Sequence, residues 1–357
     1  MKVFTKKDKK VFVGMSGGVD SSVAATLLKK DGYDVTGVFI KTWQPDWLPC
    51  TWPEERRDAM RVAAHLNIPF LTFDLSKEYK KNVADYFITE YKKGRVPNPD
   101  VMCNKEIKFG AFLKKALEMG ADYVATGHYT RLEKIENKYK LLRGIDDNKD
   151  QSYFLWTLNQ KQLKNCLFPV GEYEKPEIRK FAEKFKLPTA QKKDSQGICF
   201  LGEVEMKDFL KHYIEEKPGD VLNERGEIIG THDGAVFFTI GQRHGFNTRK
   251  EGDKSLPYYV VAKNIKKNTI TVAHEYAERE YAKKEIFLEN MNWISGKPKV
   301  GKEYDAQIRY RQQPEKCILT RNDEKTSIIF EHPQNVPSGQ SLVLYEADVC
   351  IGGGIIA

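Results

Sequence analysis

Apolar positions in the first part of the chain follow two alternating patterns. The apolar run VFVGM (11–15) is typical of a buried strand, and residues 20–30 place apolar side chains at helical spacing along one face. Residues 34–40 form a second strand-like run, which follows a stop at Asp31 and Gly32. Together these stretches predict one β-α-β unit of about 30 residues.

The same alternation of strand-like and helix-like stretches continues to about residue 187. Further helices are expected at about 54–66, 76–93, 106–119 and 174–187, and further strands at about 68–75 and 122–127. Alternation of this kind indicates a parallel sheet with helices on both faces. The fold class predicted for residues 1–212 is therefore α/β, with a doubly wound parallel sheet.

From about residue 213 the pattern changes to short apolar runs separated by turn residues. Residues 219–232 contain a hairpin-like turn at Gly226, and residues 258–274 are typical of two strands joined at Lys266–Asn268. More strand-like runs follow from residue 283 onward. We therefore predict a small central β-rich domain over 213–282 and a C-terminal β-barrel-like domain over 283–357.

Composition sets limits on the class of protein. The 357 residues carry a formal net charge of +8, whose sign suits a phosphate-bearing partner but is common among soluble proteins. No apolar stretch approaches the roughly 20 residues that a membrane span needs, and the apolar run after the basic N-terminus is too short for a secretory signal. None of the six cysteines forms a Cys-x-x-Cys pair. We therefore expect no zinc or other metal site of the protein's own, no disulfide scaffold, no membrane partner and a cytoplasmic location.

The stretch GMSGGVDSS (14–22) is a glycine-rich turn between a predicted strand and a predicted helix. It lacks the lysine of the Walker phosphate loop, and its adjacent glycines do not fit the Gly-x-Gly-x-x-Gly dinucleotide pattern. The glycines still let backbone amides approach an anion, the helix N-terminus adds a partial positive charge, and Asp20 can hold Mg²⁺ or cap the helix. Such a loop suits a departing pyrophosphate; the alternative is an ordinary glycine-rich turn capped by Ser and Asp.

This loop resembles the signature of the N-type ATP pyrophosphatases, also called PP-loop enzymes. The resemblance implies cleavage of ATP to AMP and pyrophosphate, with adenylation of a carbonyl or amide oxygen of the substrate. Because members of the superfamily bring in either ammonia or sulfur, the loop alone leaves the attacking atom open.

Two cysteines stand in polar turn sequences and favour sulfur as the attacking atom. Cys103 lies in NPDVMCNKEIKFG (98–110), just before a predicted helix, where a helix N-terminus raises the thiolate fraction. Cys199 lies in KKDSQGICFLG (192–202), after a polar turn preceded by lysines. Either cysteine by itself would more often be a buried structural residue. Cys50 is assigned no role, and the cysteines in apolar or strand-like runs are interpreted as packing residues: Cys166, Cys317 and Cys350.

Motifs along nearly the whole chain resemble those of the tRNA-specific 2-thiouridylases. They are GMSGGVDSS, NPDVMCNKEIKFG, ATGHYTR, NKDQSYFLWTL, FPVGE, KKDSQGICFLGE, TIGQRHG, RYRQ and CIGGGII. The resemblance implies an adenine nucleotide alpha hydrolase-like N-terminal domain. It implies that the wobble uridine of tRNAs for lysine, glutamate and glutamine becomes 2-thiouridine. It also implies ATP with Mg²⁺ as cofactor and, as partners, the anticodon region of tRNA and a sulfur donor such as a cysteine desulfurase or a sulfur-relay protein.

The resemblance further implies a role for each residue of the reaction centre. Cys199 carries a persulfide, and Cys103 then attacks Cys199 or releases hydrosulfide from it, which leaves a Cys103–Cys199 disulfide. Asp100 acts as general acid or base. Ile40 stands where the family often has methionine, and either side chain can pack on adenine. The residues implied to bind the nucleotide are Gly14, Met15, Ser16, Gly17, Gly18, Val19, Asp20, Ser21, Ile40 and Gly127.

A second group of residues is implied to meet the RNA. Its members are Asn98, Pro99 and Asp100 at the target base, Lys149, Asp150 and Gln151 beside it, and Arg309 and Tyr310 in the C-terminal domain. An arginine for phosphate and a tyrosine for stacking are plausible chemistry, although a single RYR would otherwise indicate a solvated strand face. His128 is either near ATP or an ordinary hydrogen-bonded histidine, and Gln242, Arg243 and His244 are a weaker RNA candidate.

Other functions remain open at this point. A nitrogen-inserting synthase of the superfamily would not need Cys103 and Cys199, and a 4-thiouridine synthetase usually carries further RNA-binding or sulfur-carrier modules. A catalytically inactive RNA-binding relative would show decay in the loop or the cysteine motifs, and both are intact in this sequence.

Overall fold

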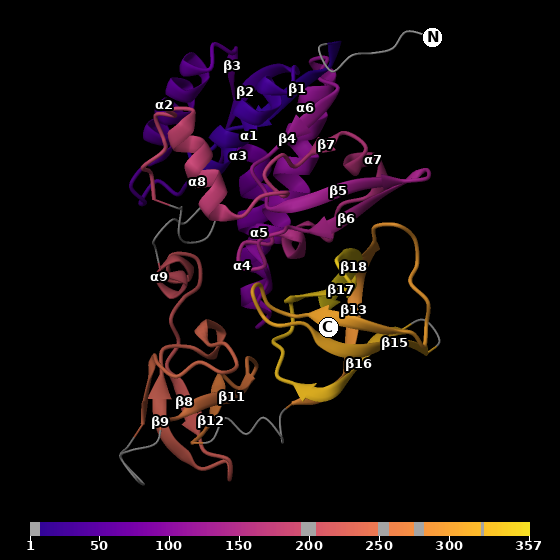
Figure 1. Cartoon of the computed structure of the whole chain (residues 1–357). Coiled ribbons are helices and arrows are strands. Elements are labelled where there is room, and N and C mark those ends of the chain that lie inside the picture. Colours follow the sequence, from indigo (N-terminus) through magenta and orange to yellow (C-terminus); the bar gives the residue numbers. More distant parts are fainter. Residues whose placement is uncertain (1–7, 194–204, 249–256, 275–281, 323–324) are drawn as a thin grey trace.

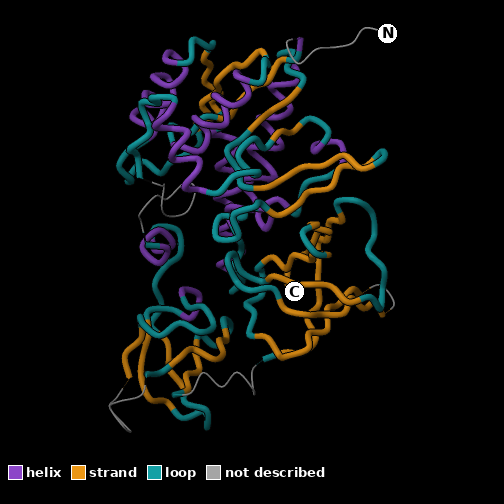
Figure 2. Tube along the Cα trace, viewed as in Figure 1, coloured by secondary structure: helices purple, strands orange, loops and turns teal. Residues whose placement is uncertain are grey.

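The computed structural model describes residues 8–193, 205–248, 257–274, 282–322 and 325–357. Figure 1 shows an N-terminal α/β part, with a central β sheet and a C-terminal β barrel next to each other at one end of it. The tube in Figure 2 shows helices concentrated in the N-terminal part and strands dominating the other two. No helix among these residues is long and apolar enough to cross a membrane.

The N-terminal sheet is parallel, as predicted. Its strands lie in the order β3-β2-β1-β4-β7. Their bounds are β1 Lys10–Gly14, β2 Asp34–Lys41, β3 Phe70–Asp74, β4 Tyr123–Ala125 and β7 Cys166–Leu167. The chain runs outward from β1 through β2 to β3 and then crosses back to β4 on the other side of β1. The crevice between the carboxyl ends of β1 and β4 is thus the switch point where open α/β sheets bind ligands.

Helices cover both faces of this sheet. One face buries apolar side chains of α1 (Val19–Lys30), α2 (Trp52–His65) and α8 (Lys175–Lys184). The other face carries two longer helical runs, each with a π-helical segment inside it. The first run consists of α3 Ser76–Tyr79, the π segment Lys80–Ala84 and α4 Asp85–Lys92; the second consists of α5 Pro99–Met102, the π segment Cys103–Phe112 and α6 Leu113–Glu118.

The predicted start of the second run at about residue 106 is wrong, because the helix begins at Pro99. The side-chain Oδ1 of Asn98 accepts hydrogen bonds from the backbone N–H groups of Asp100 and Val101, at 3.1 and 3.2 Å. Pro99 occupies the first helical position, where its missing N–H costs nothing. A cap and a proline therefore start the helix one to two turns earlier than its apolar periodicity suggests.

A β hairpin in the N-terminal part was not predicted. Strands β5 (Thr130–Ile135) and β6 (Lys138–Arg143) turn at Glu136, which has a φ of 55°. β6 pairs with β18 of the C-terminal barrel, with Cys350 opposite Leu141. The hairpin thus joins the N-terminal part to the barrel through backbone hydrogen bonds.

The central part is the predicted small β-rich unit. Its strands lie in the order β10-β9-β8-β12-β11, with β8 and β12 parallel. Their bounds are β8 Gly219–Leu222, β9 Ile228–His232, β10 Phe246–Thr248, β11 Tyr259–Asn264 and β12 Thr269–Ala273. Helix α9 (Met206–Lys211) precedes this sheet, and its Phe209 contacts Phe87 of α4 edge to face.

The C-terminal part is a closed barrel, as predicted. β13 pairs with β16 on one side and with β18 on the other, which closes the sheet on itself. The bounds are β13 Lys283–Trp293, β14 Glu303–Gln307, β15 Glu315–Asn322, β16 Lys325–Gln334, β17 Ser341–Glu346 and β18 Val349–Ile356. A side chain at Gly352 would come within 2.1 Å of the Asn292 carbonyl oxygen, so the glycines of CIGGGII let β18 close against β13. The remaining short helices are Ser152–Leu155, α7 Gln160–Leu163 and Ala235–Phe237.

Candidate nucleotide and RNA site

The glycine-rich loop lies at the switch point, directly after β1. Gly17 has a φ of 76°, and a side chain there would meet the Glu55 carbonyl oxygen at 2.4 Å. Gly18 is the N-cap of α1, and no side chain caps the helix. The first N–H groups of α1 therefore point into the crevice, where they can bind an anion.

The serines of the loop shape its backbone. Ser21 Oγ accepts from the Ser16 N–H at 3.3 Å, and Ser16 Oγ accepts from the Gly18 N–H at 3.3 Å. Ser22 Oγ donates to the Gly18 carbonyl at 2.7 Å. Weak contacts of 3.3 Å can be exchanged for a phosphate oxygen at small cost, so Ser16 and Ser21 suit an anion site.

A lysine reaches this loop from a distant part of the chain. Lys175, at the start of α8, donates from Nζ to Asp20 Oδ1 at 2.6 Å, although 155 residues separate them. The Tyr129 hydroxyl donates to the same oxygen at 2.8 Å. Sequence reasoning missed Lys175 because its spacing from the loop carries no signal. An ammonium group thus stands beside the lysine-free loop.

The other predicted nucleotide residues surround the loop in different ways. A side chain on Gly127 would come within 2.7 Å of the Ser21 nitrogen, so the chain after β4 passes directly against the loop. Gly14 lies beside Ile40, whose Cδ1 would be 3.8 Å from an added Cβ. Met15 and Val19 are buried in the apolar core, so they support the loop from below.

Cys103 lies one turn inside a helix and is 2% exposed. The expected position just before a helix is therefore wrong: the helix starts at Pro99, and the field of a helix end fades within its first turn. Cys103 opens the π segment, in which Gly110 packs against the Lys105 carbonyl. π segments are frequent at functional sites. Asp100 is half-buried in the preceding turn, and Cys199 lies outside the described residues.

The cysteines that were interpreted as packing residues are buried. Burial raises the pKa of the Cys317 and Cys350 thiols to about 12 and that of Cys166 still further. His128 is also in the core: burial, followed by the nearby Lys108 ammonium, lowers its pKa well below the usual value. Thr126 Oγ1 lies 2.7 Å from its Nδ1. The geometry therefore favours an ordinary hydrogen-bonded, buried histidine at position 128.

The segment 149–151 points mostly inward. Asp150 is 6% exposed, and its carboxylate accepts from the Gly144 and Ser152 N–H groups at 3.0 Å each. Burial raises the pKa of Asp150, while these hydrogen bonds and the charge of Arg143 act to lower it. Gln151 is paired with the backbone of Tyr129. Burial raises the pKa of the Tyr310 hydroxyl, and Lys149 lies close enough for its charge to oppose that rise.

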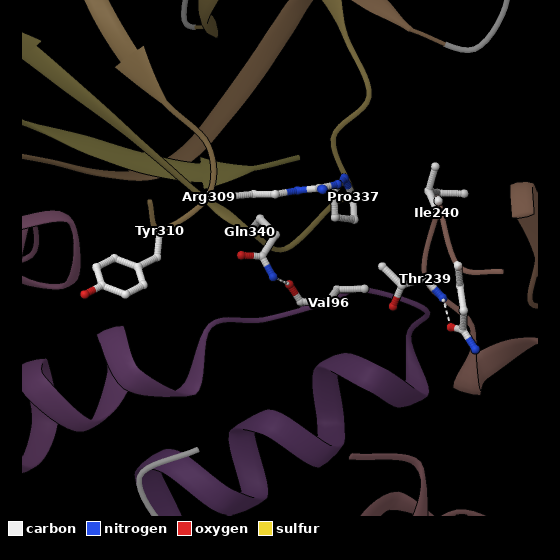
Figure 3. A pocket seen from close by; sticks show the side chains of 9 residues that line it. Val96, Thr239, Ile240, Arg309, Tyr310, Pro337 and Gln340 are labelled. Atoms are coloured by element: carbon white, nitrogen blue, oxygen red, sulfur yellow. Dashed lines mark hydrogen bonds between the residues drawn. The ribbon is translucent and has the colours of Figure 1, made fainter. Parts of the chain in front are cut away.

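Arg309 and Tyr310 lie at a junction of all three parts of the chain. A pocket of about 410 Å³ is lined by Val96, Thr239, Ile240, Gly241, Gln242, Arg309, Tyr310, Pro337 and Gln340. Figure 3 shows the Arg309 side chain reaching toward Pro337 while Tyr310 points the opposite way. Gln340 donates to the Val96 carbonyl at 2.8 Å, and Gln242 Oε1 accepts from the Thr239 N–H at 3.1 Å.

This pocket is lined by two RNA candidates and by a residue that shortly precedes the helix of the thiol candidate. Val96 lines it, and the helix that carries Cys103 begins at Pro99. Arg309 is exposed, and Tyr310 packs against Phe154 with ring centroids 4.6 Å apart. An exposed cation next to a supported aromatic ring is suited to a nucleotide phosphate and base. Among the described residues, no group of three acidic, histidine or cysteine side chains could hold a metal ion.

Comparison with known proteins now adds to this geometry. Residues 9–203 match the family described as tRNA methyl transferase HUP domain, residues 207–274 its PRC-barrel domain, and residues 283–356 the aminomethyltransferase beta-barrel domain. The chain is 46% identical over 355 residues to "tRNA-specific 2-thiouridylase MnmA" of Bacillus cereus, covering 98% of this chain and 95% of that protein. It matches the protein of the same name in Bacillus cytotoxicus equally well, at 46% over 355 residues with the same coverage.

The chain belongs to the tRNA-specific 2-thiouridylase family. This confirms the resemblance drawn from its motifs, together with the parallel-sheet domain and the two β domains. Among solved structures, the chain is similar to a 4-thiouridine synthetase in complex with RNA and bound ATP. The TM-score is 0.35 at 22% identity, over 57% of this chain and 50% of that one, a likeness too slight to bear on either chemistry.

Proposed function

We propose that this 2-thiouridylase replaces O2 of the wobble uridine by sulfur in tRNAs for lysine, glutamate and glutamine, at the expense of ATP. As a member of its family it is a sulfur-transferring, ATP-using enzyme that acts on tRNA. The observation that supports the detailed reaction is the loop at the switch point, which offers helix N–H groups and Lys175 to a polyphosphate.

In the first step, uracil O2 attacks the α-phosphorus of ATP and pyrophosphate leaves. The open N-terminus of α1 and the loop serines bind the departing oxygens. Lys175 supplies a positive charge that the loop itself lacks. Asp20 would hold Mg²⁺, because both hydrogen bonds that its carboxylate accepts from described residues fall on Oδ1 and its side chain is 33% exposed. Mg²⁺ commonly binds one carboxylate together with substrate phosphates.

In the second step, the terminal sulfur of a persulfide on Cys199 attacks C2, and AMP leaves. The Cys103 thiolate then attacks Sγ of Cys199, which breaks the bond to the transferred sulfur and leaves it on C2. The electron balance closes with a Cys103–Cys199 disulfide, which an external dithiol reduces. Asp100 handles protons in these steps. These roles rest on the resemblance, and burial of Cys103 keeps competing oxidants away from its thiol.

For the RNA, we propose that the junction pocket holds the anticodon loop near the thiols. Arg309 pairs with a phosphate and Tyr310 stacks on a base, with Lys149 nearby. The wobble base must leave the stack so that its C2 becomes accessible. Asn98 and Pro99 start the helix shortly after Val96, which lines this pocket, and we propose that the flipped base arrives beside them. We further propose the domain limits 1–212, 213–282 and 283–357, a cytoplasmic location, and a cysteine desulfurase or relay protein as sulfur donor.

The test supplies the purified chain with unmodified tRNA, labelled ATP and a persulfide donor. The expected products are AMP, pyrophosphate and 2-thiouridine, identified by thin-layer chromatography and nucleoside mass spectrometry. ADP in place of AMP would refute the loop's role, and 4-thiouridine would assign the chain to a different thiolation. Incorporation of nitrogen would indicate the synthase alternative.

A further inference from the structure

Both partners of Asp20 are held by the same turn, which lies between the nucleotide loop and the barrel. Asp20 Oδ1 accepts from Tyr129 and from Lys175, and these two residues come from different elements. Asp20 itself stands in the first turn of α1. Its orientation therefore depends on how firmly Tyr129 and Lys175 are held.

Gln151 holds Tyr129 through two hydrogen bonds. The Tyr129 N–H donates to Gln151 Oε1 at 3.0 Å, and the Gln151 N–H donates to the Tyr129 carbonyl at 2.8 Å. Gly144 closes the other side, because an added Cβ there would lie 2.8 Å from the Tyr129 carbonyl oxygen. Tyr129 is 2% exposed, so its hydroxyl has little freedom to leave Asp20.

Asp146 holds Lys175 from the same turn. Its Oδ2 accepts from the Lys175 N–H at 2.9 Å, which fixes the start of α8. Its Oδ1 accepts from the Asn148 N–H at 3.0 Å, and Asp146 is 9% exposed. The turn over residues 146–151 thus fixes both partners of Asp20. The side-chain amide of its last residue holds Tyr129, and the carboxylate of Asp146 holds Lys175.

The barrel holds this turn from the opposite side. Arg311 Nε donates to the Asn148 carbonyl at 3.0 Å. Arg143 Nη1 lies 3.3 Å from Asp150 and 3.5 Å from Gln307 of β14. The turn is therefore anchored next to Arg309 and Tyr310, at the RNA side of the molecule.

We propose that Gln151 and Asp146 are positioning residues for ATP, which hold Tyr129 and Lys175 so that Asp20 faces the polyphosphate. The inference rests on the proposed function and assigns Gln151 to the nucleotide site, where the motif alone placed it beside the RNA. The turn over residues 146–151 thus positions the partners of Asp20, and Arg311 of the C-terminal part holds that turn in place.

The test compares Gln151→Leu, which removes the acceptor, with Gln151→Glu, which keeps an Oε1 acceptor at the same length. Gln151→Leu lowers kcat/KM for ATP in AMP formation about tenfold, as expected for one lost hydrogen bond. Gln151→Glu restores it to within about threefold, and the tRNA Kd stays within about twofold of wild type in both. Tyr129→Phe combined with Gln151→Leu has a kcat/KM for ATP no lower than that of the poorer single variant, because both changes act through the hydrogen bond from Tyr129 to Asp20. Asp146→Ala lowers kcat/KM for ATP by a similar factor.

Two results would overturn the inference. A tenfold weaker tRNA Kd with unchanged ATP parameters in Gln151→Leu would make Gln151 an RNA contact. An unchanged kcat/KM in all these variants, with wild type active, would remove the positioning role. The ATP-induced rise in melting temperature needs no turnover and is smaller in Gln151→Leu than in wild type. That measurement separates a failed inference from a failed proposed function, which wild type without AMP formation would indicate.

Discussion

The glycine-rich loop, for which we propose nucleotide binding, draws its backbone N–H groups from residues 14–22, whereas the junction pocket draws its lining from all three parts of the chain. The loop uses backbone N–H groups whose directions follow from Gly17 and from the start of α1. The pocket uses side chains such as Arg309 and Gln242 that meet only after the parts are assembled. Changes at the loop should therefore alter the chemical step, and changes at the pocket should alter RNA binding.

The largest expected effect is loss of the thiol chemistry, which connects the two regions. Cys103→Ser and Cys199→Ser are expected to form no 2-thiouridine, while tRNA adenylation and the release of pyrophosphate continue. Nucleoside mass spectrometry and a pyrophosphate assay on the same reaction measure both. Peptide mapping of wild type after one turnover without reductant should find Cys103 joined to Cys199.

Cys166→Ser is the matched control for the thiols, because that cysteine is equally buried and burial raises its pKa. It is expected to thiolate tRNA normally. Full thiolation by Cys103→Ser would remove the resolving role from Cys103, and a persulfide found on Cys103 instead of Cys199 would reverse the two assignments.

Next in size is the loop carboxylate. Asp20→Ala should lower the rate of AMP formation about 10²–10³-fold, because it removes the carboxylate that Tyr129 and Lys175 hold toward the polyphosphate. The tRNA Kd should not change. Asp31→Ala, at the opposite end of α1, is the control and should keep wild-type kinetics. A weakened tRNA Kd in Asp20→Ala would break the separation between the two regions.

A smaller effect is expected at the junction pocket. If Arg309 pairs with one phosphate, Arg309→Ala should lower the slope of log Kd against log salt by about one unit. AMP formation at saturating tRNA should be unchanged. Arg321→Ala, an exposed arginine on β15, is the control. Equal slopes for wild type and Arg309→Ala, measured by filter binding, would indicate that Arg309 is a solvated surface residue that pairs with no phosphate.

The smallest effect concerns stability and pH, in a group that belongs to neither region. The native protein keeps His128 neutral because burial lowers its pKa, whereas the unfolded chain protonates it below about pH 6.5. Stability is therefore lost as the pH falls through about 6.5, by up to about 1.4 kcal/mol per pH unit. His128→Gln should flatten the curve of unfolding free energy between pH 7 and pH 5. An unchanged slope in urea titrations would place His128 at an exposed site.

Several features were visible in the sequence but were interpreted incompletely. Asn98 is a helix cap and Pro99 is a first-position proline, so the sequence already indicated the early helix start. The predicted boundary at about residue 106 followed the apolar periodicity instead. The alternating residues 130–143 around Glu136 form a hairpin that the same rules could have found. No sequence pattern predicts that the hairpin pairs with β18, because the two segments lie about two hundred residues apart and either could pair with another sheet edge.

By itself the sequence determined the parallel-sheet domain, the two β domains, the glycine-rich turn after the first strand and the family, because apolar periodicity and contiguous motifs are local properties. The tertiary structure decided what those motifs contact. It brought Lys175 to Asp20, buried Cys103 one turn inside a helix, and turned Asp150 and Gln151 inward. Each of these depends on elements that pack across the fold, and packing is set by the summed burial of distant surfaces, which no short stretch of sequence records.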